Sequence, residues 1–247
     1  MDNKSENGVQ CTQDYLSRIV PRKERLVIRD PFYEDECRWF NAAVVNKIID
    51  VRECVPKCSR RMRWKESGKD EFVVTKGESG IRHLFSLSKP PNPITFNREC
   101  LPHIAAYARL ILEFGYNQDF SSFSFYRKYS KDLLFKKKGG WYETDAEFYD
   151  VEGNLYLHVE VKKTITETEK LVRGLERTSK LTDLSKNHAK ELEYVLDLEP
   201  KYLWIVGPNS VDPEKYVYSV SVVDLDARFE PLKNLPKPPV YYEGQGR

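Results

Sequence analysis

The sequence predicts an α+β fold in which mixed central β-sheets are flanked by helices. Strict alternation of apolar and polar residues over 155–162 indicates a half-buried strand, and the aromatic-rich segment 141–149 indicates its antiparallel partner. Two segments, 39–51 and 101–115, carry apolar residues at helical spacing. A nearly continuous apolar run at 201–206 is typical of a strand buried on both faces.

The chain is long enough for one domain with a substantial core. Of its 247 residues, 40 % are hydrophobic and 13 % are aromatic, which excludes a disordered chain. We expect a flexible N-terminus at 1–20 and a single domain at 21–235. The proline-rich stretch 89–93 predicts a corner inside that domain, and the prolines after 235 predict an extended tail at 236–247.

Turn and capping signals predict the remaining elements. A short strand at 25–29 precedes the first helix, and strands at 71–75 and 81–87 form a hairpin through 76–80. After the central hairpin, Thr166-Glu-Thr-Glu169 resembles a capping box, which opens a helix with Leu171, Val172 and Leu175 facing inward. A second helical stretch covers 183–196, and a long strand covers 216–225.

The central hairpin gathers ionisable side chains on one face. Its second strand places Tyr156, His158, Glu160 and Lys162 opposite the apolar face formed by Leu155, Leu157, Val159 and Val161. Its first strand places Glu143, Asp145 and Glu147 together. The segment 150–154 carries turn residues. If the loop centres on 152–153, Asp145 lies opposite Glu160 and Glu143 lies opposite Lys162.

Facing carboxylates repel each other, so the Asp145–Glu160 pair requires a positive charge between its members. Carboxylate oxygens suit Mg²⁺ or Mn²⁺, one or two per site, and Lys162 beside them could hold a phosphate or orient an attacking water. Two alternatives stay open. The hairpin could present a solvated charged face with a simple Glu143–Lys162 ion pair, or a loop of three or five residues could shift the register by one.

Basic clusters indicate contact with nucleic acid. The net charge is only +2, but lysines and arginines gather at 22–25, 57–65 and 127–138, and the last cluster leads into the acidic hairpin. We expect nucleic acid as the partner, with Arg127, Lys128 and Lys163 among the residues that bind it. Two acids that follow the helix 101–115, Glu113 and Asp119, could also reach the hairpin.

Cysteine usage predicts an intracellular protein. The count of five is odd, and the sequence shows neither a secretory signal nor an apolar run long enough to span a membrane. We therefore expect reduced thiols in the nucleus, the cytoplasm or both, and no membrane partner. The loose pair Cys54 and Cys58 is too weak a pattern for a zinc site.

The order helix, hairpin with Asp and Glu-x-Lys, helix and strand resembles the plan of PD-(D/E)xK metal-dependent nucleases. The resemblance implies a nuclease-like domain in which Asp145 and Glu160 bind Mg²⁺ or Mn²⁺ and Lys162 assists the attack, so that these three residues form the catalytic set. The motif alone is only moderately specific, because Asp and Glu-x-Lys are common.

A narrower resemblance is to the DXO family of RNA 5′-end quality-control enzymes. It is carried in order by Ala108-Arg-Leu-Ile-Leu-Glu-Phe-Gly-Tyr-Asn-Gln-Asp119, Tyr126-Arg127 with Leu133-Leu-Phe135, Glu143-Thr-Asp145 and Val159-Glu-Val-Lys-Lys163. That family removes incomplete or non-canonical caps, triphosphate ends or NAD caps with Mg²⁺ or Mn²⁺, and often degrades RNA from the 5′ end. The resemblance implies that Asp119, Glu143, Asp145 and Glu160 are metal ligands and that Arg52 binds phosphate.

The resemblance has two departures. Asp119 stands where the family has a glutamate, and the family's glutamine on the following helix has no counterpart at 183–196. The predicted function is therefore a metal-dependent phosphohydrolase of RNA 5′ ends, a decapping enzyme or pyrophosphohydrolase with or without 5′–3′ exoribonuclease activity. The alternatives are a PD-(D/E)xK DNA endonuclease and a non-catalytic RNA-binding relative.

Overall fold

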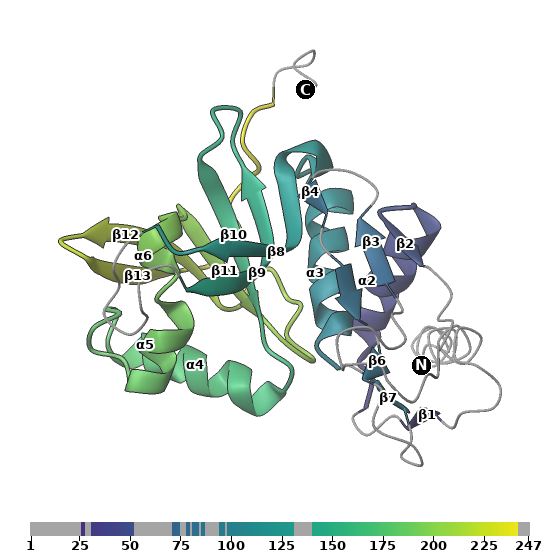
Figure 1. The fold of residues 1–247 in the computed structure, drawn as a ribbon, viewed down its shortest axis with the longest axis horizontal. Helices are drawn as coiled ribbons and strands as arrows, with labels where there is room; N and C mark the ends of the chain where they lie inside the picture. Colours follow the sequence, from purple (N-terminus) through teal and green to yellow (C-terminus); the bar gives the residue numbers. More distant parts are fainter. Residues whose placement is uncertain are drawn as a thin grey trace.

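A seven-stranded mixed β-sheet forms the centre of the computed structural model, which describes residues 26–27, 31–51, 71–74, 78–79, 81–83, 85–86, 94–96, 98–130 and 140–241 (Figure 1). The strand order is β13-β12-β11-β10-β9-β8-β4. The strands are β4 (Glu78–Ser79), β8 (Ser121–Lys128), β9 (Trp141–Tyr149), β10 (Leu155–Val161), β11 (Tyr202–Val206), β12 (Val217–Val223) and β13 (Asp226–Leu232). The pairs β10–β11 and β4–β8 are parallel, and the other pairs are antiparallel.

Two small sheets accompany the large one. The first contains β1 (Leu26–Val27), β7 (Ile94–Phe96) and β6 (Phe85–Ser86). The second contains β2 (Ile49–Val51), β3 (Glu71–Val74) and β5 (Ile81–His83). The antiparallel β3–β5 pair confirms the early hairpin, although the second predicted strand divides into β5 and β6 and these join different sheets.

Helices cover both faces of the large sheet. The helices α2 (Glu34–Val45) and α3 (Cys100–Leu112) share one apolar core with Trp204 and Val206 of β11. The helices α4 (Ile165–Arg177), α5 (Lys186–Leu192) and α6 (Val195–Leu198) share the other core with Leu203 and Ile205. Because successive side chains of β11 enter opposite cores, the prediction of a strand buried on both faces is confirmed. The mixed sheet with flanking helices confirms the α+β class.

The first helix lies earlier in the chain than its apolar spacing predicts. It ends at Val45, because Lys47 adopts a left-handed conformation at φ 55° and the Ile48 amide donates back to the Ala43 carbonyl over 2.9 Å. Ile48 and Ile49 are still buried, but from the turn and from β2. The prediction of one helix over 39–51 was therefore wrong in its boundaries, since residues of a turn and a strand continued the apolar pattern.

The other predicted helices are present with different bounds, and the stretch predicted at 183–196 divides into α5 and α6. The helix α3 ends where Gly115 adopts φ 76°, and the Tyr116 amide donates to the Leu110 carbonyl over 3.0 Å. The helix α4 buries Leu171, Val172 and Leu175 as predicted. Its N-cap, however, is Thr164, whose side chain accepts from the Glu167 amide over 3.2 Å, so the capping box expected at 166–169 lies two residues too late.

The central hairpin has the predicted register, but it reaches this register through a longer loop and a β-bulge that the sequence did not predict. Tyr149 pairs with Leu155, which leaves a five-residue loop closed by the Asp150 amide and the Asn154 carbonyl at 3.0 Å. A bulge at Tyr156 then shifts the register by one residue. Glu147 lies opposite His158 and Ala146 lies opposite Val159. In this register the next pair is Asp145 and Glu160, one residue past the end of the paired ladder.

Two strands, β8 and β13, were not predicted from the sequence. The strand β8 was expected only as a basic segment, and the run 216–225 was expected as one strand. Instead β12 turns at Asp224 and Leu225, which adopt φ 51° and 61°, and returns as β13 with Val223 opposite Asp226. This geometry is typical of a tight hairpin turn, but the turn lacks the Asn or Gly that would signal it.

Several predictions fall outside the described residues. These concern 1–20, the corner at 89–93, the basic clusters at 22–25 and 57–65, most of the cluster at 127–138, and Arg52. Residues 236–241 form no regular element. In the part of the chain that the structure describes, no helix combines the length and the apolar character needed to cross a membrane.

Candidate active site

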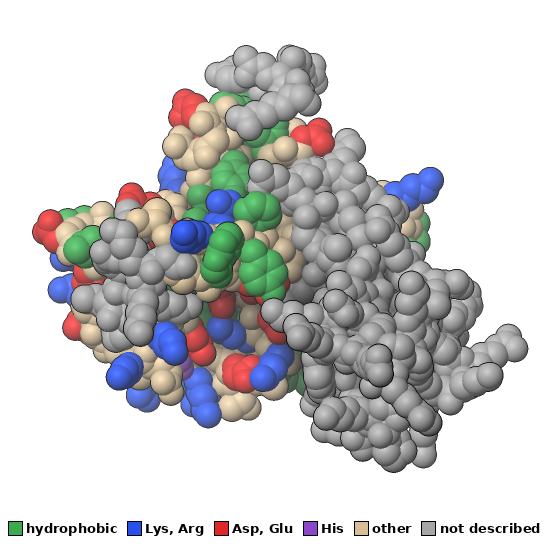
Figure 2. Space-filling model, in the orientation of Figure 1, with side chains coloured by type: hydrophobic (Ala, Val, Ile, Leu, Met, Phe, Trp, Pro, Cys, Tyr) green, Lys and Arg blue, Asp and Glu red, His purple; other side chains and the backbone are tan. Residues whose placement is uncertain are grey.

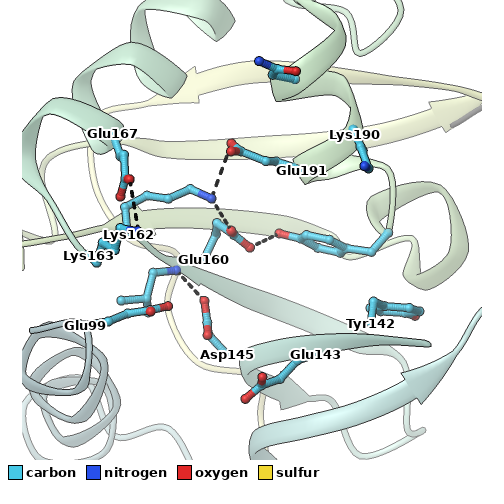
Figure 3. Close-up of a pocket in the computed structure, with 13 residues that line it drawn as sticks. Glu99, Tyr142, Glu143, Asp145, Glu160, Lys162, Lys163, Glu167, Lys190 and Glu191 are labelled. Atoms are coloured by element: carbon cyan, nitrogen blue, oxygen red, sulfur yellow. Dashed lines mark hydrogen bonds and ion pairs between the residues drawn. The ribbon is translucent and has the colours of Figure 1, made fainter. Parts of the chain in front are cut away.

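A pocket of about 710 Å³ lies beyond the carboxyl end of β10, between this strand, β9 and the helices α4 and α5 (Figure 3). Such a position outside the end of a parallel strand is where open α/β sheets commonly bind ligands. The pocket is lined by Glu99, Tyr142, Glu143, Asp145, Glu160, Val161, Lys162, Lys163, Glu167, Asn187, Lys190, Glu191 and Tyr194. Six carboxylates face three lysines, so the pocket carries a formal excess of negative charge.

Asp145 marks the point where the β9–β10 ladder ends. The last paired residues are Ala146 and Val159. One step further, the Val161 amide donates to Asp145 Oδ2 over 2.7 Å, so a side chain takes the place of a backbone acceptor. His103 of α3 donates through Nε2 to the Asp145 carbonyl oxygen over 2.7 Å. Asp145 is therefore held from both sides and is only 8 % exposed.

Glu160 and Lys162 form the electrostatic centre of the pocket. Lys162 Nζ lies 2.7 Å from Glu160 Oε1 and 3.5 Å from Glu191 Oε2, and Figure 3 shows it reaching between the two acids. The Tyr194 hydroxyl donates to Glu160 Oε2 over 2.6 Å. Burial acts to raise the pKa of Glu160, but Lys162 and His158 outweigh it and hold the pKa well below its usual range. Glu160 is therefore ionised at neutral pH.

The pKa of Lys162 is shifted in the opposite direction to that of Glu160. Burial acts to lower the pKa of the ammonium group, but the Glu160 and Glu191 carboxylates outweigh it and raise the pKa above its usual range. Burial, followed by the charge of Glu160, also raises the pKa of Tyr194 well above its usual value. The tyrosine is therefore a hydrogen-bond donor at neutral pH.

Glu143 lies at the exposed rim of the pocket. The Ser124 hydroxyl donates to Glu143 Oε1 over 2.6 Å, and Ser124 itself adopts a left-handed conformation at φ 55°. The expected Glu143–Lys162 pairing lies past the end of the ladder, and Lys162 binds Glu160 and Glu191 instead. Glu143 therefore lines the exposed rim of the pocket.

The donor chemistry fits a divalent cation. Glu143, Asp145 and Glu160 offer carboxylate oxygens of the kind that Mg²⁺ and Mn²⁺ prefer, and the pocket has a surplus of acid. Among the described residues, however, no three His, Cys, Asp or Glu side chains converge on one point as metal ligands do. In this arrangement the Lys162 ammonium supplies the positive charge that the facing acids require. A bound cation would have to share Glu160 with Lys162.

Asp119 and Glu113, the acids expected to reach the hairpin, lie outside this pocket lining. The helix α3 approaches the site with its first turn, where His103 binds Asp145, so its last turn lies about 15 Å away by the helical rise of ten residues. Glu113 pairs there with Arg109. Asp119 is exposed in the 3-10 helix η1 (Gln118–Phe120). Of the four predicted metal ligands, Glu143, Asp145 and Glu160 therefore line one pocket, and Asp119 does not.

The predicted substrate-binding residues have different positions. Lys163 lines the pocket, is 62 % exposed and lies 3.7 Å from Glu167. Lys128 is exposed on β8 outside the lining. Arg127 instead binds the buried Glu147 through Nε at 3.0 Å and Nη2 at 2.7 Å, and it also contacts Tyr149. This pairing makes Arg127 a structural residue in the arrangement described.

Two buried polar residues, Glu147 and His158, lie next to Glu160 in the sheet. Burial acts to raise the pKa of Glu147, but the Arg127 hydrogen bonds and charge outweigh it and lower the pKa. His158 lies opposite Glu147, with its ring centroid 4.7 Å from that of Tyr194. Its Nε2 is 3.6 Å from Glu160 Oε2, which is too long for a hydrogen bond. The His158 ring therefore packs beside Glu160 and Tyr194 without a hydrogen bond to the carboxylate.

Sequence reasoning missed the contribution of the second helical stretch. Lys190, Glu191 and Tyr194 all line the pocket, but in the sequence they look like polar and apolar positions of an ordinary amphipathic segment. One signal in the sequence is the N-cap Ser185, whose side chain accepts from the His188 amide and marks where α5 begins. No protein-family model matches the chain, and no curated protein matches it either.

Proposed function

We propose that this protein is a metal-dependent phosphohydrolase that acts on RNA 5′ ends. It would act as a decapping enzyme or pyrophosphohydrolase, with or without 5′–3′ exoribonuclease activity. The observation that carries the proposal is the shared pocket of Glu143, Asp145, Glu160 and Lys162, with Asp145 and Glu160 on facing strands. The sequence resemblance to PD-(D/E)xK nucleases and to the DXO family rests on the same acids and lysine. These residues therefore carry the proposed chemistry.

Each residue has a proposed role. Glu143, Asp145 and Glu160 would hold Mg²⁺ or Mn²⁺, which when bound lowers the pKa of a water and stabilises negative charge on phosphate oxygens. Lys162 keeps Glu160 ionised and offsets the charge that develops on the phosphoryl group. Tyr194 fixes the orientation of the Glu160 carboxylate through its hydrogen bond. Tyr194 is thus a positioning residue.

An aromatic platform beside the pocket favours a polynucleotide over a small phosphate ester. Tyr126 and Trp141 are 63 % and 66 % exposed. In the β8–β9 ladder Tyr126 lies opposite Glu143, and Lys128 lies opposite Trp141, so all four side chains share one face. Exposed aromatic rings beside a lysine are typical of surfaces that stack bases and bind the backbone of a single strand. Figure 2 shows hydrophobic side chains beside Lys and Arg near the middle of this face.

The test is a comparison of substrates with Mn²⁺ present. The purified protein is incubated with single-stranded RNA bearing a triphosphate, a cap, an NAD cap or a monophosphate, and in parallel with plasmid DNA. The proposal expects release of a 5′-end product from at least one RNA. Plasmid cleavage alone would instead identify a DNA endonuclease. Salt-sensitive RNA binding without any product would identify a non-catalytic relative.

A further inference from the structure

A second cavity, of about 380 Å³, lies between α4 and α5. Its lining includes Lys170, Arg173, Arg177 and His188, together with a single carboxylate, Asp183. Arg173 is paired with Glu169 at 2.6 Å. No carboxylate of the described residues forms an ion pair with Lys170 or Arg177. The cavity therefore offers two unneutralised cations to an anion.

A glycine in the lining of this cavity allows α5 to pack closely against α4. Gly174 lies in the interior of α4, where glycine costs about 1 kcal/mol relative to alanine. A Cβ atom at this position would lie 3.0 Å from His188 Nδ1 and 3.3 Å from Leu184 Cδ2. The glycine thus allows the His188 ring to lie close against α4 beside the cavity.

The basic cavity continues the acid pocket along one stripe of α4. Glu167 lines the acid pocket, and Lys170, Gly174 and Arg177 follow it at steps of three, four and three residues, which is the spacing of one helix face. The helix α5 likewise turns Lys190 to the acid pocket and His188 to the basic cavity. From Glu167 to Arg177 the rise along the axis is about 15 Å. Figure 2 shows Lys and Arg side chains gathered over α4 and α5 on the face that carries the aromatic platform.

We propose that the α4–α5 cavity is a phosphate-binding subsite for a single-stranded polynucleotide whose 5′ end enters the acid pocket. The inference rests on the proposed function for the identity of the strand, and it adds where the backbone runs after the reacting end. A length of about 15 Å holds about four nucleotides of a stacked strand at about 3.4 Å each. Lys170 and Arg177 bind phosphates of this segment, and neither residue belongs to the reacting centre.

The experiment measures binding of fluorescein-labelled oligouridylates of two, four, six and ten nucleotides by anisotropy, without metal, so that no turnover is needed. For the natural chain, affinity should rise between two and six nucleotides and then level off. The double variant Lys170→Gln/Arg177→Gln should bind the six-nucleotide strand roughly tenfold more weakly. The slope of log affinity against log salt should fall by about 1.4, because each lost phosphate contact removes about 0.7.

The matched control is Lys233→Gln/Lys237→Gln, which removes the same charge from exposed lysines that line neither cavity. Its affinity should stay within about twofold of the natural chain. Equal weakening in both double variants, or unchanged binding in the α4 variant, would overturn the subsite. Loss of RNA hydrolysis with retained, α4-dependent strand binding would refute the proposed function and leave the subsite standing.

Discussion

Lys162 Nζ lies 2.7 Å from Glu160 Oε1, and both residues line the same pocket, with only Val161 between them in the chain. Each side chain is little more than one-tenth exposed, so the pair is largely removed from water. A carboxylate that has lost most of its hydration must be balanced by a nearby charge. The lysine is therefore the resident counter-charge of the acid site, and its removal has consequences for both stability and ionisation.

Replacing Lys162 by methionine should lower the free energy of unfolding by about 3 kcal/mol at pH 7, because a buried carboxylate loses its partner. Glu160 has a depressed pKa in the folded protein, so its contribution is present above the unfolded value of about 4.3 and is lost as the pH falls. Lys162 has a raised pKa, so its contribution is present below about 10.4 and is lost as the pH rises further.

Urea unfolding of the two proteins across the pH range checks this prediction. The stability difference should be constant between about pH 5 and pH 10 and should shrink below about pH 4. The variant Lys162→Arg, which keeps the charge, is the control and should lose less. A difference that persists undiminished in acid would show that packing, and not the ion pair, explains the effect.

Tyr194→Phe removes one hydroxyl and leaves the ring. Because this hydroxyl donates to a carboxylate within a buried site, its loss should lower the free energy of unfolding by about 2 kcal/mol. Tyr142→Phe is the matched control, since its hydroxyl donates to Asp197 over 3.0 Å, whereas the Tyr194 hydroxyl donates to Glu160. Proton titration of Glu160 by NMR should show a raised pKa only in the Tyr194 variant. An identical titration in both variants would remove Tyr194 as a positioning residue.

Arg127→Met should behave as a stability variant and not only as a binding variant. Its two hydrogen bonds to the buried Glu147 predict a loss of about 3 kcal/mol in thermal or urea unfolding. Glu147 has a lowered pKa, so this contribution is present above about pH 4.3 and declines below it. Lys128→Gln on the same strand is exposed and should change stability little. Equal stability of both variants would return Arg127 to the substrate-binding set.

Metal affinity should depend on the acids that line the pocket and not on Asp119, which lies outside the lining. Calorimetry with Mn²⁺ should show binding to the natural chain and to Asp119→Ala, because Asp119 lies outside the pocket lining. Binding should weaken at least tenfold in Asp145→Asn, which keeps the shape and the Val161 hydrogen bond but removes a charge. Loss of binding in Asp119→Ala with no loss in Asp145→Asn would contradict the assignment of ligands.

The sequence predicted the strongest periodic elements and the relation between the central acids. Alternation over 155–162 identified β10, and the facing of Asp145 and Glu160 followed from the strand period. That success depended on two deviations that cancel, since the loop has five residues and the bulge at Tyr156 restores the register. A one-residue slip would have moved the acids to opposite faces, and no residue in 150–156 specifies the bulge.

Other features depended on tertiary packing that local patterns do not encode. The direction in which α3 approaches the sheet decides that His103, and not Asp119, lies near Asp145. Burial of Glu147 decides that Arg127 binds an internal acid and is unavailable as a free phosphate ligand. In both cases the distance of the residue from the pocket is set by the layers of the fold and cannot be read from the residue type.

The central claim is that the facing acids and Lys162 form a phosphohydrolase site, and one variant tests it most directly. Glu160→Gln keeps the size of the side chain and removes the charge that Lys162 balances. With Mn²⁺ and 5′-triphosphate RNA, the natural chain should release a product, and Glu160→Gln should lose at least a hundredfold in rate while remaining folded. Equal rates for the two proteins would contradict the assignment of this pocket as the active site.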